Sequence, residues 1–392
     1  MGGGLMQLVA YGAQDIYLTG NPQITFFKVV YRRHTNFSME AIEQTPNGGL
    51  PAAGASGRQT FTISRNGDLV SNCFLEMPAG FINVTNGGAN PYTGLISSIE
   101  CEIGGQKIDK HTGAWMETWY ELTESNTGNL GAAQTVAMAS VATYTPFQKA
   151  TACGGVQGYG GTSTAPAYVP LTFWFCRNPG LALPLIALQY HEVKLILNYG
   201  GEDVHTTTIQ PKLWCNYIYL DTDERRRFAQ VSHEYLIEQV QEQSFAATDT
   251  NMELNFNHPV KELVFLGTPN PGGAATRGPS TGTLPTTTNT YQLKLNGHDR
   301  FAAQRWEYFT RHQVNHYHSG NGGVLVTDSI GVYSFALKPE EHQPSGTCNF
   351  SRIDNAQLKP SAAVGGSGLN VYAVNYNVLR IMSGMGGLAY SN

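Results

Sequence analysis

The stretch YQLKLNGHDRF, residues 291–301, decides how this 392-residue chain is interpreted. Its apolar side chains Tyr291, Leu293 and Leu295 alternate with polar ones, and an Asn-Gly pair follows. Strict alternation is typical of a strand with one buried face, and Asn-Gly favours the backbone of a two-residue hairpin turn. The stretch therefore predicts a short strand that turns tightly into the next one.

The first half of the chain carries the same scheme. In SSIECEIGGQKI, residues 97–108, Ile99, Cys101 and Ile103 alternate with glutamates before a Gly-Gly turn. A second correspondence joins FWFCRNPG (173–180) to VYSFALKPE (332–340), each interpreted as an aromatic strand that a proline ends. Because both correspondences occur in the same order in both halves, they indicate an internal duplication.

Two further stretches predict strands. QITFFKVVYRR, residues 23–33, is apolar on both alternating faces, which is typical of a strand between two layers. In TFTISRNGDLVSNCFLEM, residues 60–77, Asn66-Gly67 lies between alternating apolar runs and predicts a hairpin.

Composition supports an all-β protein. Forty-four glycines, 19 prolines and only 14% charged residues suit many short strands, tight turns and long surface loops. A formal net charge of −5 supplies no positive field for a polyanion, so direct binding of nucleic acid is not expected. The six cysteines form no C-x-x-C pair, and for those that lie in apolar, strand-like runs we expect reduced, buried thiols.

The charge-rich stretch DTDERRRF, residues 221–228, separates the two halves. An Asp three residues before a Glu resembles a capping box, so a short helix is expected there, held by local ion pairs. The resulting division is an N-terminal arm (1–22), a first domain (23–220), a connector (221–234) and a second domain (235–392). The connector residues singled out are Asp221, Glu224, Arg225, Arg226 and Arg227.

No constellation for catalysis or for a cofactor emerges. His316 and His318 have the spacing of a cupin metal site, but the glutamate that such a site needs soon afterwards is absent. The glycine-rich CGGVQGYGG, residues 153–161, lacks the Lys-Ser/Thr ending of a phosphate loop. We therefore expect no enzyme activity, no metal site and no cofactor.

At the level of whole segments the chain resembles the major capsid proteins of large icosahedral double-stranded DNA viruses, especially those of algal (chlorella) viruses. The resemblance implies a double jelly roll, two eight-stranded antiparallel sandwiches in tandem with short connecting helices. It also implies a homotrimer that forms a pseudo-hexagonal capsomer of the outer virion shell. The segments that carry it are GNPQITFFKVVYRRHTNF (20–37), FCRNPGLALPLIALQYHEVKLIL (175–197), DERRRFAQVSHEYLIEQV (223–240), LKLNGHDRF (293–301), FALKPEEHQPSGTCNFSRIDNAQL (335–358) and NVYAVNYNVLRIMSGMGGLAYSN (370–392).

The resemblance also assigns partners and sites. Loops 79–94, 123–167 and 268–289 would face the host, while the arm would meet minor capsid proteins or an internal membrane, with assembly in the host cytoplasm. Glycosylation is expected on outer-loop asparagines, with Asn83, Asn126 and Asn289 as candidates. The alternative function is a carbohydrate-binding β-sandwich that attaches to host glycans.

Overall fold

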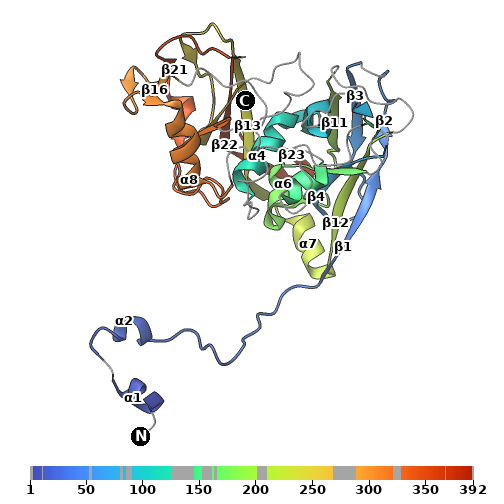
Figure 1. Ribbon diagram of the computed structural model, residues 1–392. Coiled ribbons are helices and arrows are strands. Elements are labelled where there is room, and N and C mark those ends of the chain that lie inside the picture. The colour runs from blue at the N-terminus through green and yellow to red at the C-terminus, as the bar shows by residue number, and fades with distance from the viewer. Residues whose placement is uncertain are drawn as a thin grey trace. The chain divides into compact units, whose positions relative to one another are not determined.

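The computed structural model describes residues 3–10, 12–52, 55–79, 83–84, 91–124, 145–151, 161–162, 166–200, 210–267, 288–320, 328–366 and 368–390 (Figure 1). The chain forms two compact units, Met1–Asn36 and Phe37–Asn392. Most of the three long loops predicted to face the host lie outside the described residues.

Two antiparallel sheets form the first half of the larger unit. In the first sheet β1 pairs with β12, β12 with β4, and β4 with both β10 and β9; in the second the order is β2-β3-β11-β6-β7. The strands are β1 (Phe37–Gln44), β2 (Pro46–Asn47), β3 (Gly57–Thr62), β4 (Leu69–Met77), β6 (Ile96–Ile103), β7 (Gln106–His111), β9 (Ala167–Pro170), β10 (Leu183–Pro184), β11 (Val193–Tyr199) and β12 (Lys212–Leu220). A separate two-stranded ribbon joins β5 (Asn83–Val84) to β8 (Gly161–Thr162).

The second half repeats this arrangement. One sheet has the order β13-β22-β15-β19, with β20 beside β15 and β23 beside β22, and the other has the order β14-β21-β16-β17, with β18 beside β16. The strands are β13 (His233–Phe245), β14 (Met252–Glu253), β15 (Pro259–Gly267), β16 (Thr290–Leu295), β17 (His298–Asp299), β18 (Gln304–Arg305), β19 (Ile330–Ser334), β20 (Cys348–Asn349), β21 (Ala356–Pro360), β22 (Leu369–Met382) and β23 (Met385–Leu388). The predicted duplication is therefore present as two sandwiches.

The two sandwiches share apolar packing. Side chains from both sheets of the first half meet in one core, which Val70, Phe61 and Leu195 exemplify. Leu379 and Ile381 from the end of β22 are buried in that same core, although β22 belongs to the second half. A separate core fills the second sandwich. The second half therefore completes the first core.

Short helices connect and cover the sheets. The longest of the described helices, α4 (Gly113–Thr123), is capped by Thr112, whose hydroxyl accepts a hydrogen bond from the amide of Trp115. The other helices are α1 (Gly3–Val9), α2 (Ile16–Thr19), α3 (Pro91–Leu95), α5 (Pro146–Thr151), α6 (Trp174–Arg177), η3 (Pro179–Leu181), α7 (Thr222–Gln230), the π-helical turn η4 (Tyr308–Gln313), α8 (Val314–Tyr317) and η5 (Phe350–Arg352). Among the described residues, none of these helices is long and apolar enough to cross a membrane.

Two of the three hairpins predicted from alternation and turn residues are confirmed. β6 pairs with β7 across Gly104-Gly105, and β16 pairs with β17 across Asn296-Gly297. All four turn residues have positive φ, as a type I′ turn requires.

The hairpin predicted at Asn66-Gly67 is wrong. β3 and β4 flank this pair but belong to different sheets, and neither residue has a positive φ. The glycine serves another purpose, because a Cβ on Gly67 would lie only 2.9 Å from the Cβ of Tyr217. The pair marks a close approach between segments far apart in sequence.

Two other predicted strands are also wrong. Phe175 lies in helix α6 instead of a strand, whereas Phe335 directly follows strand β19. The segments 173–180 and 332–340, which correspond in sequence, therefore differ in secondary structure. Residues 24–31 form no strand either. Their side chains are exposed, and within residues 3–10 and 12–36 the smaller unit contains no strand for them to pair with. A segment that is apolar on both faces needs cover on both faces, and the described part of this unit does not provide it.

Candidate functional site

The connector between the sandwiches is the helix α7. The side chain of Asp221 caps it by accepting a hydrogen bond from the amide of Thr222 at 2.8 Å. Phe228, near the other end of the helix, packs with Leu69 and Ile218 of the first sandwich. The helix predicted from the sequence is therefore present and rests against the first sandwich.

One of the three consecutive arginines anchors this helix. The guanidinium of Arg225 pairs with Asp68 through two nitrogen–oxygen contacts of 3.0 Å, one of them a hydrogen bond, and Asp68 also accepts a hydrogen bond from the amide of Leu220. Arg226 and Arg227 are exposed, and no ion pair with another described residue involves them. The ion-pair role predicted for the arginine cluster therefore falls on Arg225.

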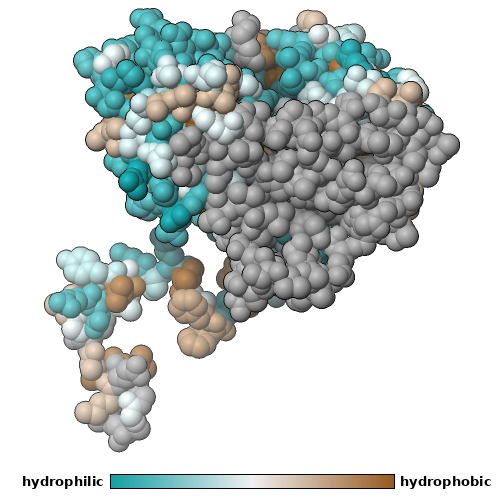
Figure 2. Space-filling model, turned by 45° about the horizontal axis from the view of Figure 1, so that its top comes forward, coloured by the Kyte–Doolittle hydropathy of each residue, from teal (hydrophilic) through white to brown (hydrophobic). Residues whose placement is uncertain are grey.

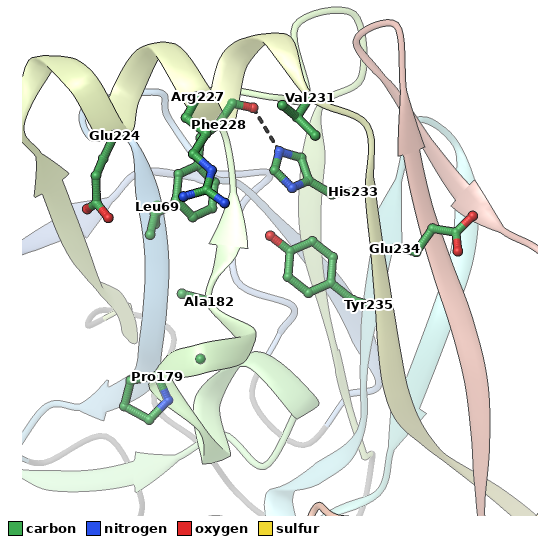
Figure 3. A pocket seen from close by; sticks show the side chains of 11 residues that line it. Leu69, Pro179, Ala182, Glu224, Arg227, Phe228, Val231, His233, Glu234 and Tyr235 are labelled. Carbon is green, nitrogen blue, oxygen red and sulfur yellow. Dashed lines mark hydrogen bonds between the residues drawn. The ribbon is translucent and has the colours of Figure 1, made fainter.

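An open pocket of about 470 Å³ lies beneath α7 (Figure 3). Phe228, His233 and Tyr235 stack in a row along it, with ring centres 5.3 Å and 5.9 Å apart. Glu224 and Arg227 of the predicted connector lie at its rim. The connector thus contributes to a surface cavity as well as to the link between the sandwiches.

Helix α4 joins the two sandwiches through aromatic packing. It belongs to the first half, yet Trp115 and Trp119 pack against β15, β19 and β22 of the second half, beside which α4 lies in Figure 1. The ring centres of Trp115 and Tyr372 are 5.2 Å apart. Burial of two tryptophans contributes several kcal/mol of apolar free energy, on the order of 1.5–3 kcal/mol for each large side chain.

Buried and partly buried ionisable side chains meet beside this helix in what we term the junction cluster, defined as Arg177, Glu238, Lys261, Glu262, His318, Glu340 and His342. At its centre, Glu238 forms ion pairs with Arg177 at 2.8 Å and with Lys261 at 2.9 Å. Arg177 comes from the first half, and its guanidinium also lies 3.9 Å from the centre of the Trp119 ring. Burial disfavours ionisation of Glu238, but the hydrogen bond from His342 and the charges of Lys261 and Arg177 outweigh it and lower the pKa to about 2.

The second part of the junction cluster centres on His318. Its two ring nitrogens lie 3.0 Å from Glu262 and 3.2 Å from Glu340. Burial by itself would lower the pKa of His318, but the charge and hydrogen bond of Glu262, followed by those of Glu340, raise it to about 9. His318 is therefore protonated at neutral pH.

The cupin-like histidine pair does not form a metal site. His316 lies in helix α8 and stacks on His312, whereas His318 points to carboxylates inside the junction cluster. Within the described ranges, no group of three His, Cys, Asp or Glu side chains has a geometry that could hold a metal ion.

The glycosylation candidates lie in three different settings. Asn83 is in β5, and Asn126 lies outside the described residues. Asn289 is only 5% exposed, and its amide nitrogen donates a 2.7 Å hydrogen bond to the carbonyl of Ala363. A glycan attached to that nitrogen needs open space, which the buried side chain does not have, so the burial argues against Asn289.

One feature of the sequence indicates the junction cluster, although no motif points to it. Lys261 and Glu262 are adjacent charges inside β15, an otherwise apolar strand, and both are completely buried. Charged side chains in such a position need partners, because an unpaired buried charge is very costly. The partners come from segments roughly 20 to 90 residues away in the chain, so only the folded protein brings them together.

Comparisons with known proteins agree with this architecture. A family described as "Major capsid protein N-terminus" matches residues 25–221, and one described as "Large eukaryotic DNA virus major capsid protein" matches residues 224–387. The chain is 50% identical to the major capsid protein of Pyramimonas orientalis virus over 418 residues and 42% identical to that of Paramecium bursaria Chlorella virus 1 over 466 residues. Both alignments cover all of both chains.

Solved structures extend the likeness to the fold. The VP54 protein of PBCV-1, fitted into a cryo-EM reconstruction of the virophage Sputnik, is 37% identical with a TM-score of 0.73. The alignment covers 94% of this chain and 100% of VP54. The Faustovirus major capsid protein, at 14% identity and a TM-score of 0.65, shares the fold over 95% of this chain and 94% of its own. The two tandem sandwiches are thus a double jelly roll, and the chain belongs to the family of major capsid proteins of large eukaryotic DNA viruses, which are structural proteins and not enzymes.

Proposed function

We propose that this chain is the repeating subunit of an icosahedral shell and that it acts as a homotrimer. Three copies would present six similar sandwiches, and a closed ring of six blocks tiles a surface in a hexagonal pattern. A structural neighbour at 37% identity comes from a quasi-atomic model of the PBCV-1 virus capsid. The comparisons favour this function over a carbohydrate-binding module.

The observation that carries the proposal is the rigid joining of the two sandwiches. Apolar side chains of β22 complete the first core, α4 packs on the second half, and the junction cluster pairs Arg177 of the first half with Glu238 of the second. A building block of a shell has to hold the angle between its two halves, because that angle determines whether neighbouring blocks fit. This joining supports the role of a fixed tile over that of two mobile modules.

The native mass of the purified protein tests the proposal. One chain has a mass of 42.6 kDa, so a trimer has a mass of about 128 kDa, three times that value. Native mass spectrometry or analytical ultracentrifugation should show this species. A stable monomer at micromolar concentration would refute the trimeric subunit.

Further parts of the proposal concern partners and modification. We infer that the outer loops face the host, that the N-terminal arm meets minor capsid proteins or an internal membrane, and that assembly takes place in the host cytoplasm. The division at residues 22, 220 and 234 and the glycans on Asn83 and Asn126 stay predictions. Peptide mapping by mass spectrometry of protein from virions, if it found both asparagines bare, would remove the glycans from the proposal.

A further inference from the structure

Two buried cysteines lie opposite each other in the first sheet. Cys73 of β4 and Cys215 of β12 are direct partners in the antiparallel register, and both side chains are 0% exposed. Both are free thiols, and the thiol of Cys73 donates a hydrogen bond of 3.2 Å to the sulfur of Cys215. They are 142 residues apart in the chain, so the pairing of β4 with β12 is what brings the two sulfurs together.

The backbone at the two cysteines belongs to the narrow type of antiparallel pair. The carbonyl of Cys73 accepts a hydrogen bond from the amide of Leu171, which follows β9 on the side of β4 that faces away from β12. Because the amide and the carbonyl of a strand residue point to the same neighbouring strand, Cys73 and Cys215 form a pair without mutual backbone hydrogen bonds. The Cα atoms of such a pair are about 4.5 Å apart, within the range of about 4.4–6.8 Å that a disulfide spans. A bond between the two sulfurs therefore needs little movement of the strands.

A third thiol connects this pair to the solvent. Figure 2 shows that the described surface of the larger unit is mainly hydrophilic in that view, and the two paired cysteines lie beneath the surface, out of reach of a dissolved oxidant. Cys176, in helix α6, is only half-buried and shares a hydrogen bond with Cys73. Of the three thiols, Cys176 is thus the one that a molecule in solution can reach.

Burial also controls how fast Cys73 reacts. It raises the pKa of the Cys73 thiol well above its ordinary value, and the hydrogen bonds with Cys176 and Cys215 raise it further. The thiolate is the form that attacks a disulfide, so little of Cys73 is reactive at neutral pH. Oxidation of the pair is therefore slow and depends on the more exposed thiol beside it.

We propose that Cys73 and Cys215 form a reversible disulfide within one chain, by exchange with a small-molecule disulfide that enters at Cys176. The Cys176 thiolate attacks one sulfur of glutathione disulfide and releases one glutathione. Cys73 then attacks the sulfur of Cys176 and releases the second glutathione. Finally Cys215 attacks the sulfur of Cys73 and frees Cys176 again. In sum, two protein thiols are oxidised, one glutathione disulfide is reduced to two glutathione thiols, and these take up the two thiol protons.

The bond would join the two inner strands of the first sheet, β4 and β12. A cross-link over a loop of 142 residues removes conformational freedom from the unfolded chain and so stabilises the folded one. A pair at the short end of the Cα range forms a strained bond that is readily reduced, which makes the modification reversible. The pair lies within one chain, so its oxidation does not depend on the proposed assembly of copies.

Peptide mapping of the wild-type protein tests the bond without any substitution. The full-length protein is incubated with oxidised glutathione at mildly alkaline pH, which raises the thiolate fraction. The remaining thiols are blocked in denaturant, and the digest is analysed by mass spectrometry. We expect a pair of peptides linked through Cys73 and Cys215 that dithiothreitol separates. Recovery of both cysteines as blocked thiols, or linked only to other cysteines, would overturn the inference.

Two variants test the route through Cys176. Cys176→Ser should slow formation of the bond by about tenfold or more, because the thiol that meets the oxidant is lost. Cys101→Ala is the control, since Cys101 is buried in the same core but takes no part in the exchange, and it should oxidise at the wild-type rate. Equal rates for Cys176→Ser and the wild-type protein would contradict entry at Cys176.

The melting temperature measures the effect of the bond on stability. Closure of a loop of this length should raise the melting temperature of the oxidised wild-type protein by about 5 °C over the reduced protein. Cys215→Ala, treated in the same way, should show no such rise. An oxidised wild-type protein that melts no higher than the reduced one would show that the bond distorts the sheet, against the fit of the narrow pair.

Discussion

Replacement of Glu238 by Gln tests whether the junction cluster holds the two sandwiches together. Gln keeps the shape of the side chain but removes the negative charge that faces Lys261, whose side chain is completely buried. Removal of one partner from a buried ion pair typically costs about 3–5 kcal/mol, because the remaining charge is left uncompensated. At about 2.1 cal/mol/K of unfolding entropy per residue over residues 37–392, a loss of about 4 kcal/mol lowers the melting temperature by about 5 °C.

The assay is differential scanning fluorimetry at one scan rate, with a control on the same strand. Glu234→Gln removes an ion pair between Glu234 and Arg380 whose side chains are both half exposed, so it should change stability by less than about 1 kcal/mol. The double variant Glu238→Gln/Lys261→Met removes the uncompensated charge of Lys261, while the amide oxygen at position 238 can still accept the hydrogen bond from Arg177, so it should recover most of the loss. If Glu238→Gln has the same melting temperature as the wild-type protein, or if the double variant melts no higher than Glu238→Gln, the reasoning about Lys261 is refuted.

Three further predictions concern the connector, pH and the arm. Arg225→Ala should cost about 1 kcal/mol through loss of the pair between the half-exposed Arg225 and the buried Asp68, whereas Arg226→Ala should leave the melting curve unchanged; equal curves for both would contradict the anchoring role. Because the pKa of His318 rises from its ordinary 6.5 to about 9 on folding, its contribution to stability is complete below pH 6.5 and is lost as the pH rises through 9. Melting temperatures between pH 6 and 10 should therefore fall more in the wild-type protein than in His318→Gln, and parallel profiles would count against the prediction. Deletion of residues 1–22 should leave the trimer intact in ultracentrifugation but impair shell formation seen by electron microscopy, and loss of the trimer would contradict this.

The parts of the fold that local pattern determines were predictable. The hairpins at Gly104-Gly105 and Asn296-Gly297 and the helix α7 depend on residues next to one another in the chain, and the structure contains all three. The hairpin predicted at Asn66-Gly67 was wrong because a distant residue determines this position: the glycine makes room for Tyr217, far along the chain.

The junction cluster could be predicted from the sequence only in part. Buried charges such as Lys261 inside an apolar strand indicate that partners exist, but Glu238 lies on another strand of the second sandwich and Arg177 belongs to the first half, so only the folded chain brings them together. Residues 24–31 have the composition of a strand and no strand to pair with in the described part of their unit. Their composition predicted that another surface would cover them, but it did not identify the molecule that provides this surface.

The contribution of β22 to the first core has a consequence for synthesis of the chain. Leu379 and Ile381 lie near the C-terminus, yet they fill the core of the half that leaves the ribosome first. At about 5–20 residues per second, roughly 10 to 30 s separate the emergence of residue 220 from that of residue 381. During that interval the nascent first sandwich exposes an apolar gap that β22 has yet to close, and transiently exposed apolar surface of this kind is prone to aggregation.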